Sequence, residues 1–199
     1  MKKYIIFIIS IFFICISTTL AEEVKLVKCI DGDTFKANLK GKEATIRMLA
    51  IDTPEIAKDD KPADYFGKEA SEYTCKKLTN AKKIVLEYDK KSDRVDKYDR
   101  VLAWIFVDDK LLEEELVKQG YAKVAYLYDD YKYTSIIQTA QEIASNKELG
   151  IWNTEEKNKF DKGIVSPKET DEDSENKEII IVTVIFLVIA LISKLIRKK

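Results

Sequence analysis

The sequence predicts an α+β fold in which a five-stranded β-barrel is accompanied by three helices. Five short segments are rich in β-branched and apolar residues, and three longer segments are predicted to be helices, the first of which repeats apolar residues at helical spacing. Turn-forming residues separate most of these segments. Two further apolar runs lie at the ends of the chain, outside the predicted domain.

The predicted strands begin with a pair that flanks the corner Asp31-Gly32-Asp33. An Asp-Gly corner between two such segments is typical of antiparallel strands. The third strand ends before Pro54, which has no N–H to donate to a ladder. Asp52 and Glu55 are therefore expected at a strand end, where sites are often built. The predicted strands cover residues 24–30, 34–39, 44–51, 84–88 and 100–107.

Three segments are predicted to be helical. In the first, apolar residues from Ala70 to Leu78 recur at helical spacing. Gly120 and Gly150 follow the other two segments and would end those helices. The predicted helices cover residues 67–80, 111–119 and 133–148, and residues 121–128 form a Tyr-rich extended crossing. Five short strands with three helices fit a partly open barrel of the OB type.

The first 21 residues have the pattern of a secretory signal peptide. Lys2 and Lys3 precede an apolar run, and small residues follow up to Ala21, after which we expect cleavage. An uncleaved N-terminal anchor is the alternative. Either one would export the domain that follows, which we assign to residues 22–155.

A charged stretch and an apolar run follow the domain. Residues 156–178 are rich in Lys, Asp, Glu, Ser and Asn, which predicts a disordered linker. As a helix, residues 179–196 are long enough to cross a thin bilayer, and the basic tail 197–199 would remain in the cytoplasm. We expect a single-pass membrane anchor with the domain outside. A cell-wall sorting signal is less favoured, because no Leu-Pro-x-Thr-Gly motif precedes the run.

Composition excludes several classes of chemistry. The chain has no histidine, which removes Ser-His-Asp triads, histidine general bases and His-dependent zinc sites. Its three cysteines are too few for a disulfide framework or a Cys-based zinc site. Cys15 lies in the signal peptide, so Cys29 and Cys75 remain, either as a disulfide or as two half-buried thiols.

Acidic side chains and one arginine gather in the segment from Asp31 to Glu55. Asp33, Asp52 and Glu55 offer hard oxygen donors, and Arg47 offers a guanidinium. Such a set could hold a hard cation against a phosphate. Each fragment alone is as typical of an ordinary turn.

In combination with a second basic segment, these fragments resemble the thermonuclease family, the staphylococcal nuclease homologues. The resemblance covers residues 24–152, and the ordered set is specific where a single fragment would be weak. The fragments are Ile30-Asp31-Gly32-Asp33-Thr34, Arg47-x-x-x-Ile51-Asp52-Thr53-Pro54-Glu55, Gly67-x-Glu69-Ala70, Asp96-Lys97-Tyr98-x-Arg100, Leu116-Val117-x-Gln119-Gly120-x-Ala122 and Ile151-Trp152. The resemblance implies an OB-fold, dependence on Ca²⁺, and hydrolysis of DNA and RNA phosphodiesters.

The resemblance also implies roles for individual residues. The carboxylates of Asp33 and Asp52 and the backbone carbonyl of Thr53 would bind Ca²⁺, with Asp31 as an outer carboxylate. Glu55 would be the general base that activates water. The substrate would meet Arg47 and Arg100 at its phosphate, Lys97, Tyr98, Tyr126 and Tyr128 along the nucleotide site, and Lys61 on a nearby loop.

These roles agree with the chemistry of a phosphodiester. A dication and two guanidiniums would neutralise the charge that grows on the phosphoryl oxygens, and a carboxylate can take the proton of water where no histidine exists. Tyr126 and Tyr128 are two residues apart on an extended segment, so both rings would face the same way and could stack on a base. Ordinary barrel-face aromatics are the alternative.

Two features depart from the family pattern. Asp99 stands where the family usually has glycine, directly before Arg100, and could alter the turn or compete for that arginine. Residues 22–155 contain 23 Lys and Arg against 27 Asp and Glu, a net charge of −4. A negative domain lacks long-range attraction for nucleic acid, so affinity should depend on local basic residues and bound Ca²⁺.

The sequence thus predicts a membrane-anchored, extracytoplasmic, Ca²⁺-dependent nuclease that acts on single-stranded DNA and RNA with little sequence preference. By resemblance, cleavage of the 5′ P–O bond would leave 3′-phosphates. We expect a monomer. The alternatives are a tethered, non-catalytic nucleic-acid-binding module and a protein-binding OB domain. Intact Arg47, Glu55 and Arg100 disfavour both, because a binding module needs no general base.

Overall fold

The computed structural model describes residues 21–59 and 61–164. Four predicted segments fall outside the described residues: the signal peptide apart from Ala21, the linker beyond residue 164, the anchor at residues 179–196 and the tail at 197–199. No helix within residues 21–59 and 61–164 combines the length and the apolar character needed to cross a membrane.

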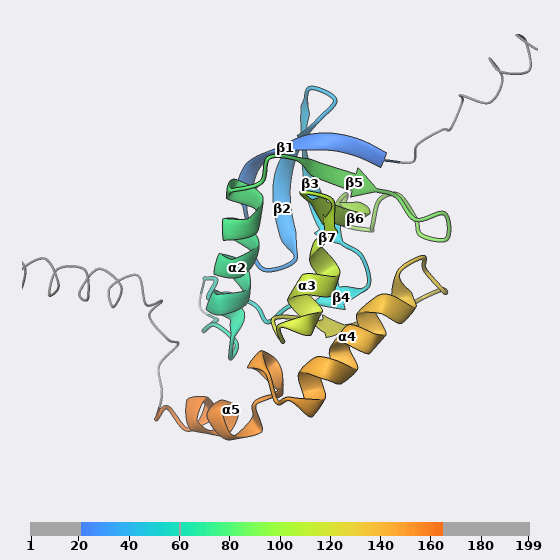
Figure 1. Ribbon diagram of the computed structural model, residues 1–199. Coiled ribbons are helices and arrows are strands. Elements are labelled where there is room, and N and C mark those ends of the chain that lie inside the picture. Colours follow the sequence, from blue (N-terminus) through green and yellow to red (C-terminus); the bar gives the residue numbers. More distant parts are fainter. Residues whose placement is uncertain (1–20, 60, 165–199) are drawn as a thin grey trace, which may run out of the picture. The chain divides into compact units, whose positions relative to one another are not determined.

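Five strands form a barrel, which confirms the predicted α+β architecture (Figure 1). They are β1 (Ala21–Cys29), β2 (Thr34–Leu39), β3 (Lys42–Met48), β5 (Ile84–Glu87) and β6 (Val101–Val107). Neighbours pair antiparallel in the order β3-β2-β1-β5-β6, and a parallel pairing of β3 with β6 closes the barrel.

Three two-residue strands complete the sheets. β7 (Lys110–Leu111) pairs with β6, and β4 (Ile51–Asp52) pairs with β8 (Lys123–Val124). In the second pair Asp52 lies opposite Lys123. The end of the third predicted strand is thereby joined to the Tyr-rich segment, which contains β8.

The core lies inside the barrel because alternate residues of each strand point inward. In β2, Phe35 and Ala37 are fully buried, while Asn38 on the same strand is exposed. Trp104 on β6 is also fully buried, and its indole Nε1 donates a hydrogen bond to Asp89 Oδ2 at 2.9 Å. The indole thus keeps a polar partner inside an apolar core.

Helices pack around the strands, as Figure 1 shows. The three predicted helices are present as α2 (Gly67–Thr79), α3 (Leu112–Lys118) and α4 (Thr134–Asn146). α2 contacts β1, and α3 lies against β6 and α4. α2 buries Ala70, Thr74 and Leu78, the face that the helical spacing predicts.

Two elements differ from the prediction. The third strand was expected to run through residue 51, but β3 ends at Met48 and the chain resumes at β4, because Ala50 has a left-handed φ of 59° that breaks the ladder. A 3₁₀ turn, η2 (Gly150–Trp152), leads into a further helix, α5 (Thr154–Asp161). We expected residues 156–161 to belong to a disordered linker, whereas Asn153 Oδ1 caps this helix by accepting a hydrogen bond from Glu156 N at 3.0 Å.

Cys29 and Cys75 form a disulfide, which decides between the two alternatives left open by the sequence. The sulfurs are 2.07 Å apart and the Cα atoms 5.7 Å apart. The bridge joins the end of β1 to α2. It therefore lies immediately before the Asp31-Gly32-Asp33 corner.

Candidate active site

The corner between β1 and β2 is held by local hydrogen bonds. The amides of Ile30 and Asp31 donate to Thr34 O, and Asp33 N donates to Asp31 Oδ1 at 3.1 Å. α2 adds a bond from Thr74 Oγ1 to Gly32 O at 2.6 Å. A Cβ at Gly32 would lie 2.6 Å from Thr53 Oγ1, so this close approach requires glycine.

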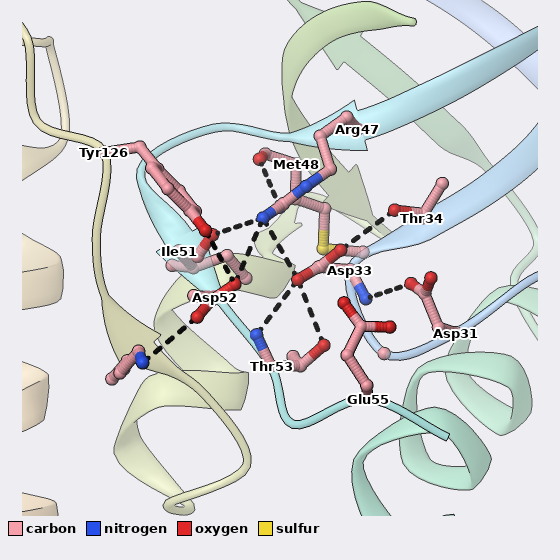
Figure 2. A network of polar contacts seen from close by, with 12 residues as sticks. Asp31, Asp33, Thr34, Arg47, Met48, Ile51, Asp52, Thr53, Glu55 and Tyr126 are labelled. Atoms are coloured by element: carbon pink, nitrogen blue, oxygen red, sulfur yellow. Dashed lines mark hydrogen bonds and ion pairs between the residues drawn. The ribbon is translucent and has the colours of Figure 1, made fainter. Parts of the chain in front are cut away.

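Asp33 is buried at the centre of a polar network (Figure 2). Its Oδ1 accepts from Thr34 Oγ1 at 2.9 Å. Its Oδ2 accepts from Thr53 N at 2.9 Å and from Thr53 Oγ1 at 3.1 Å, and lies 3.2 Å from Arg47 Nη2. These contacts fix the carboxylate in one orientation.

Arg47 lies on β3 with its guanidinium buried against backbone carbonyls. Nη1 donates to Met48 O at 2.9 Å and Nη2 donates to Ile51 O at 3.0 Å. These carbonyls flank the break between β3 and β4. Nη2 also lies 3.6 Å from Asp52 Oδ1. The guanidinium is therefore positioned by backbone carbonyls as well as by the two carboxylates.

Asp52 lies where β4 meets β8. Its Oδ2 is 3.1 Å from Lys123 Nζ, and its Oδ1 accepts from the hydroxyl of Tyr126 at 3.4 Å. The Tyr126 ring lies under the Arg47 guanidinium, 5.7 Å from Cζ to the ring centroid. The β4–β8 pairing thus brings Tyr126 to the acidic set.

Carboxylates crowd this end of the site, and burial together with their mutual repulsion raises two pKa values. Burial, followed by the charges of Asp33 and Glu55, raises the pKa of Asp31 to about 6. Burial and the charges of Asp33, Asp52 and Asp64 raise the pKa of Glu55, and Arg47 opposes that increase. Negative oxygens that repel one another favour a bound cation.

The donor chemistry fits Ca²⁺, which prefers carboxylate and carbonyl oxygens. Asp33 and Asp52 could supply carboxylates, and Thr53, whose amide is held by Asp33, could supply its carbonyl. Within residues 21–59 and 61–164 no group of three or more His, Cys, Asp or Glu side chains is arranged to hold a metal ion. The set implied by the family resemblance contains two such side chains and a backbone carbonyl.

A pocket of about 820 Å³ connects the acidic set to the second basic segment. Arg47, Asp52 and Glu55 line one part of it. The other predicted residues in its wall are Asp31, Asp33, Lys97, Tyr98, Arg100, Tyr126 and Tyr128. Tyr98 is 66% exposed and Tyr128 82% exposed, so both rings are open to solvent.

Arg100 is held by Asp96. Asp96 Oδ2 accepts from Arg100 Nε at 2.8 Å and pairs with Nη2 at 2.6 Å. Burial acts to raise the pKa of Asp96, but hydrogen bonds from Arg100 and from the Tyr98 amide lower it below its ordinary value. Asp99 adopts a left-handed φ of 61°, which explains why glycine suits this position. Among the ion pairs of the described residues, Arg100 pairs with Asp96 and none joins it to Asp99.

Two predicted residues lie off the pocket wall. Lys61 is exposed on the loop after Glu55, where its backbone pairs with Lys58, and it does not line the pocket. Thr53 is buried behind Asp33. The sequence interpretation also missed Lys91 and Tyr131, which line the pocket. Their basic and aromatic character gave a weak signal, because both types are frequent in this chain.

Several known proteins are similar in sequence to this chain. The family described as staphylococcal nuclease homologue matches residues 45–154. A thermonuclease of Staphylococcus hyicus is 39% identical over 129 residues, which are 65% of this chain and 75% of that protein. Endonuclease YncB of Bacillus subtilis (strain 168) is 42% identical over 131 residues, 65% of this chain and 61% of that protein. A thermonuclease of Staphylococcus intermedius is 39% identical over 137 residues, 68% of this chain and 80% of that protein.

Proposed function

The chain belongs to the staphylococcal nuclease homologue family and is homologous to thermonucleases and endonucleases, which are phosphodiester hydrolases, and on this premise we propose a specific activity for it. It is a Ca²⁺-dependent nuclease that hydrolyses DNA and RNA with little sequence preference. Single-stranded substrates are preferred. Cleavage of the 5′ P–O bond leaves a 3′-phosphate.

One observation carries this proposal. Arg47, Glu55 and Arg100, which come from β3, the loop after β4 and the segment before β6, line the same pocket beside Asp33 and Asp52. A base, two guanidiniums and two cation-binding carboxylates are the parts that hydrolysis of a phosphodiester needs. A module that only binds nucleic acid has no use for the base.

The side chains suggest how the reaction proceeds. Glu55 takes a proton from a water molecule whose oxygen attacks phosphorus in line with the 5′ oxygen. The P–O5′ bond breaks, and the leaving oxygen is protonated from solvent. Arg47 and Arg100 hold the phosphoryl oxygens, on which negative charge grows. When bound, Ca²⁺ supplies further neutralisation of this charge.

Arg47 is suited to this role because backbone carbonyls position it. Its bonds to Met48 O and Ile51 O do not depend on Asp33 or Asp52. The guanidinium therefore keeps its place when a cation engages those carboxylates. In the part of the chain that the structure describes, Arg100 has one anionic partner, Asp96, and its planar fork retains further donors for a phosphate.

We also propose that the enzyme acts outside the cell, tethered to the membrane as a monomer. The support is the signal-peptide pattern of residues 1–21, the apolar run at 179–196 with its basic tail, and the Cys29–Cys75 disulfide, which fits an oxidising compartment. Cell fractionation tests this location: the full chain should sediment with membranes, and a chain that ends at residue 164 should be released into the medium.

The activity is tested on denatured DNA with the full chain purified in detergent. We expect degradation in Ca²⁺, none in chelator, and a loss of about 10²-fold or more for Glu55→Gln because the base is removed. Glu23→Gln changes an exposed carboxylate on β1, outside the pocket wall, and should remain fully active. Binding of DNA without any cleavage would instead support the tethered binding module.

A further inference from the structure

The Glu55 side chain has no hydrogen-bond partner of its own within residues 21–59 and 61–164. Figure 2 shows its carboxylate rising from the loop after β4 toward Asp33 and Asp31. The hydrogen bonds of this residue involve only its backbone N and O. A general base must nevertheless be held at a defined distance from its water. Its position must therefore come from whatever fixes its backbone.

Asp64 fixes that backbone from both sides. Glu55 N donates to Asp64 Oδ2 at 3.1 Å, and Asp64 N donates to Glu55 O at 2.9 Å. The two residues are nine positions apart, so this pair closes the base of the loop that carries Lys61. Asp64 does not line the pocket and thus has no direct access to substrate there.

The start of α2 locks Asp64 in turn. Gly67 N donates to Asp64 O at 3.0 Å, and a Cβ at Gly67 would lie 2.1 Å from Glu55 O. Tyr65, which follows Asp64 in the chain, is anchored to α5. Its hydroxyl donates to Glu156 Oε2 at 3.3 Å, and its ring centroid lies 5.5 Å from that of Phe160. Asp64 is therefore held between two helices while it holds Glu55.

We propose that Asp64 is a positioning residue for the reaction, acting through its hydrogen bond to the Glu55 amide to aim the Glu55 carboxylate. This inference depends on the proposed function, in which Glu55 is the general base. Loss of the Asp64 acceptor lets the Glu55 backbone shift, which reduces the rate of the chemical step and leaves substrate binding to Arg47 and Arg100 intact.

The test compares kcat and KM of full-chain variants in detergent on a single-stranded oligonucleotide at saturating Ca²⁺. Asp64→Ala should lower kcat about 10- to 100-fold with KM changed less than twofold, since a misplacement of about 1 Å can cost that much. Asp64→Asn should stay within about threefold of the parent, because the Asn amide oxygen can accept the Glu55 N–H. Asp59→Asn, which removes a carboxylate from the same loop, should leave both constants unchanged.

Other outcomes overturn the proposal. A rise in KM with kcat unchanged would assign Asp64 to binding, and an Asn variant as slow as Ala would assign the effect to charge. An unchanged kcat for Asp64→Ala in a folded protein would exclude positioning. The Glu55→Gln variant distinguishes failure of the proposed general base from failure of the proposed role of Asp64. If Glu55→Gln keeps full activity, the proposed base is wrong. If Glu55→Gln is inactive and Asp64→Ala is normal, only the role of Asp64 fails.

Discussion

Glu113 is a fully buried carboxyl group in the first turn of α3. Both of its oxygens accept from Ile105 N, Oε1 at 3.0 Å and Oε2 at 3.1 Å. Burial raises the pKa of Glu113 well above its ordinary value, and hydrogen bonds from the amides of Glu113 and Ile105 and the charge of Arg47 only partly oppose this. An ionised carboxylate here is costly because no water solvates it.

We predict that Glu113→Gln stabilises the domain at alkaline pH. Because the folded-state pKa is raised, the Glu113 carboxyl makes its full contribution to the free energy of unfolding below its unfolded-state pKa. This contribution is lost as pH rises through the folded-state pKa. The Gln amide oxygen can still accept from Ile105 N and never ionises. Urea unfolding of residues 22–164 should show a gain of about 1–2 kcal/mol at pH 8 and little at pH 4.5.

The matched control is Glu114→Gln, the next residue on α3, which is partly exposed. This change should alter stability by less than about 0.5 kcal/mol at either pH. If Glu113→Gln raised the free energy of unfolding equally at both pH values, ionisation of the Glu113 carboxyl would not be what destabilises the folded protein.

At the residue scale, sequence could predict the charged types of the site and their neighbours along the chain. Asp33 and Asp52 both pair with Arg47, and Glu55 lines the same pocket, while their chemical roles remain predictions. Asp64 escaped notice because its contact with Glu55 depends on the closure of a loop, which no local pattern encodes. The burial of Glu113 was not predicted either, because a glutamate in the first turn of a helix is ordinarily exposed to solvent.

At the element scale, periodicity predicted the five barrel strands and three helices because each has a clear apolar face. It failed where a backbone angle or a cap decides the structure. The left-handed Ala50 divides the third strand into β3 and β4, although the apolar run continues across it. The charged composition of α5 did not indicate a helix. Asn153 nevertheless caps its start, and Phe160 packs it against Tyr65.

The disulfide should contribute substantially to stability. It closes a span of 46 residues between β1 and α2, which corresponds to about 3–4 kcal/mol of lost entropy in the unfolded chain. The double variant Cys29→Ser/Cys75→Ser should lose about this amount in urea unfolding of residues 22–164. Wild-type protein in reductant should unfold at the same midpoint as the variant.

The same variant should keep most of its activity at 20 °C. The Asp31-Gly32-Asp33 corner retains the Thr74–Gly32 bond and the two Thr53–Asp33 bonds without the bridge. We expect a rate within about threefold of the parent, since these contacts still fix Asp33. Inactivity of a folded double variant would show that the bridge itself positions the corner.

At the scale of the whole molecule, the predicted domain has the same sign of net charge as its proposed polyanionic substrate. Residues 22–155 carry 23 basic and 27 acidic side chains, a net charge of −4. Several lysines are neutralised locally: Lys36 pairs with Glu43, Lys77 with Glu115 and Lys132 with Glu87. Because the net charge of the domain is negative, long-range attraction for a polyanion is weak, and binding should depend on the pocket itself.

This distribution predicts a shallow salt dependence of binding. If Arg47, Lys97 and Arg100 are the phosphate contacts, the slope of log affinity against log salt for a single strand is about −2, so affinity falls about 20-fold between 50 and 200 mM salt. Anisotropy of a labelled oligonucleotide with the Glu55→Gln variant, at constant Ca²⁺, measures the slope without cleavage. Lys97→Ala should make it less steep by about 0.7, whereas Lys42→Ala, at an exposed residue outside the pocket wall, should not change it. A slope steeper than about −4 would mean that further lysines follow the strand across the surface, and the negative domain charge would then not govern association.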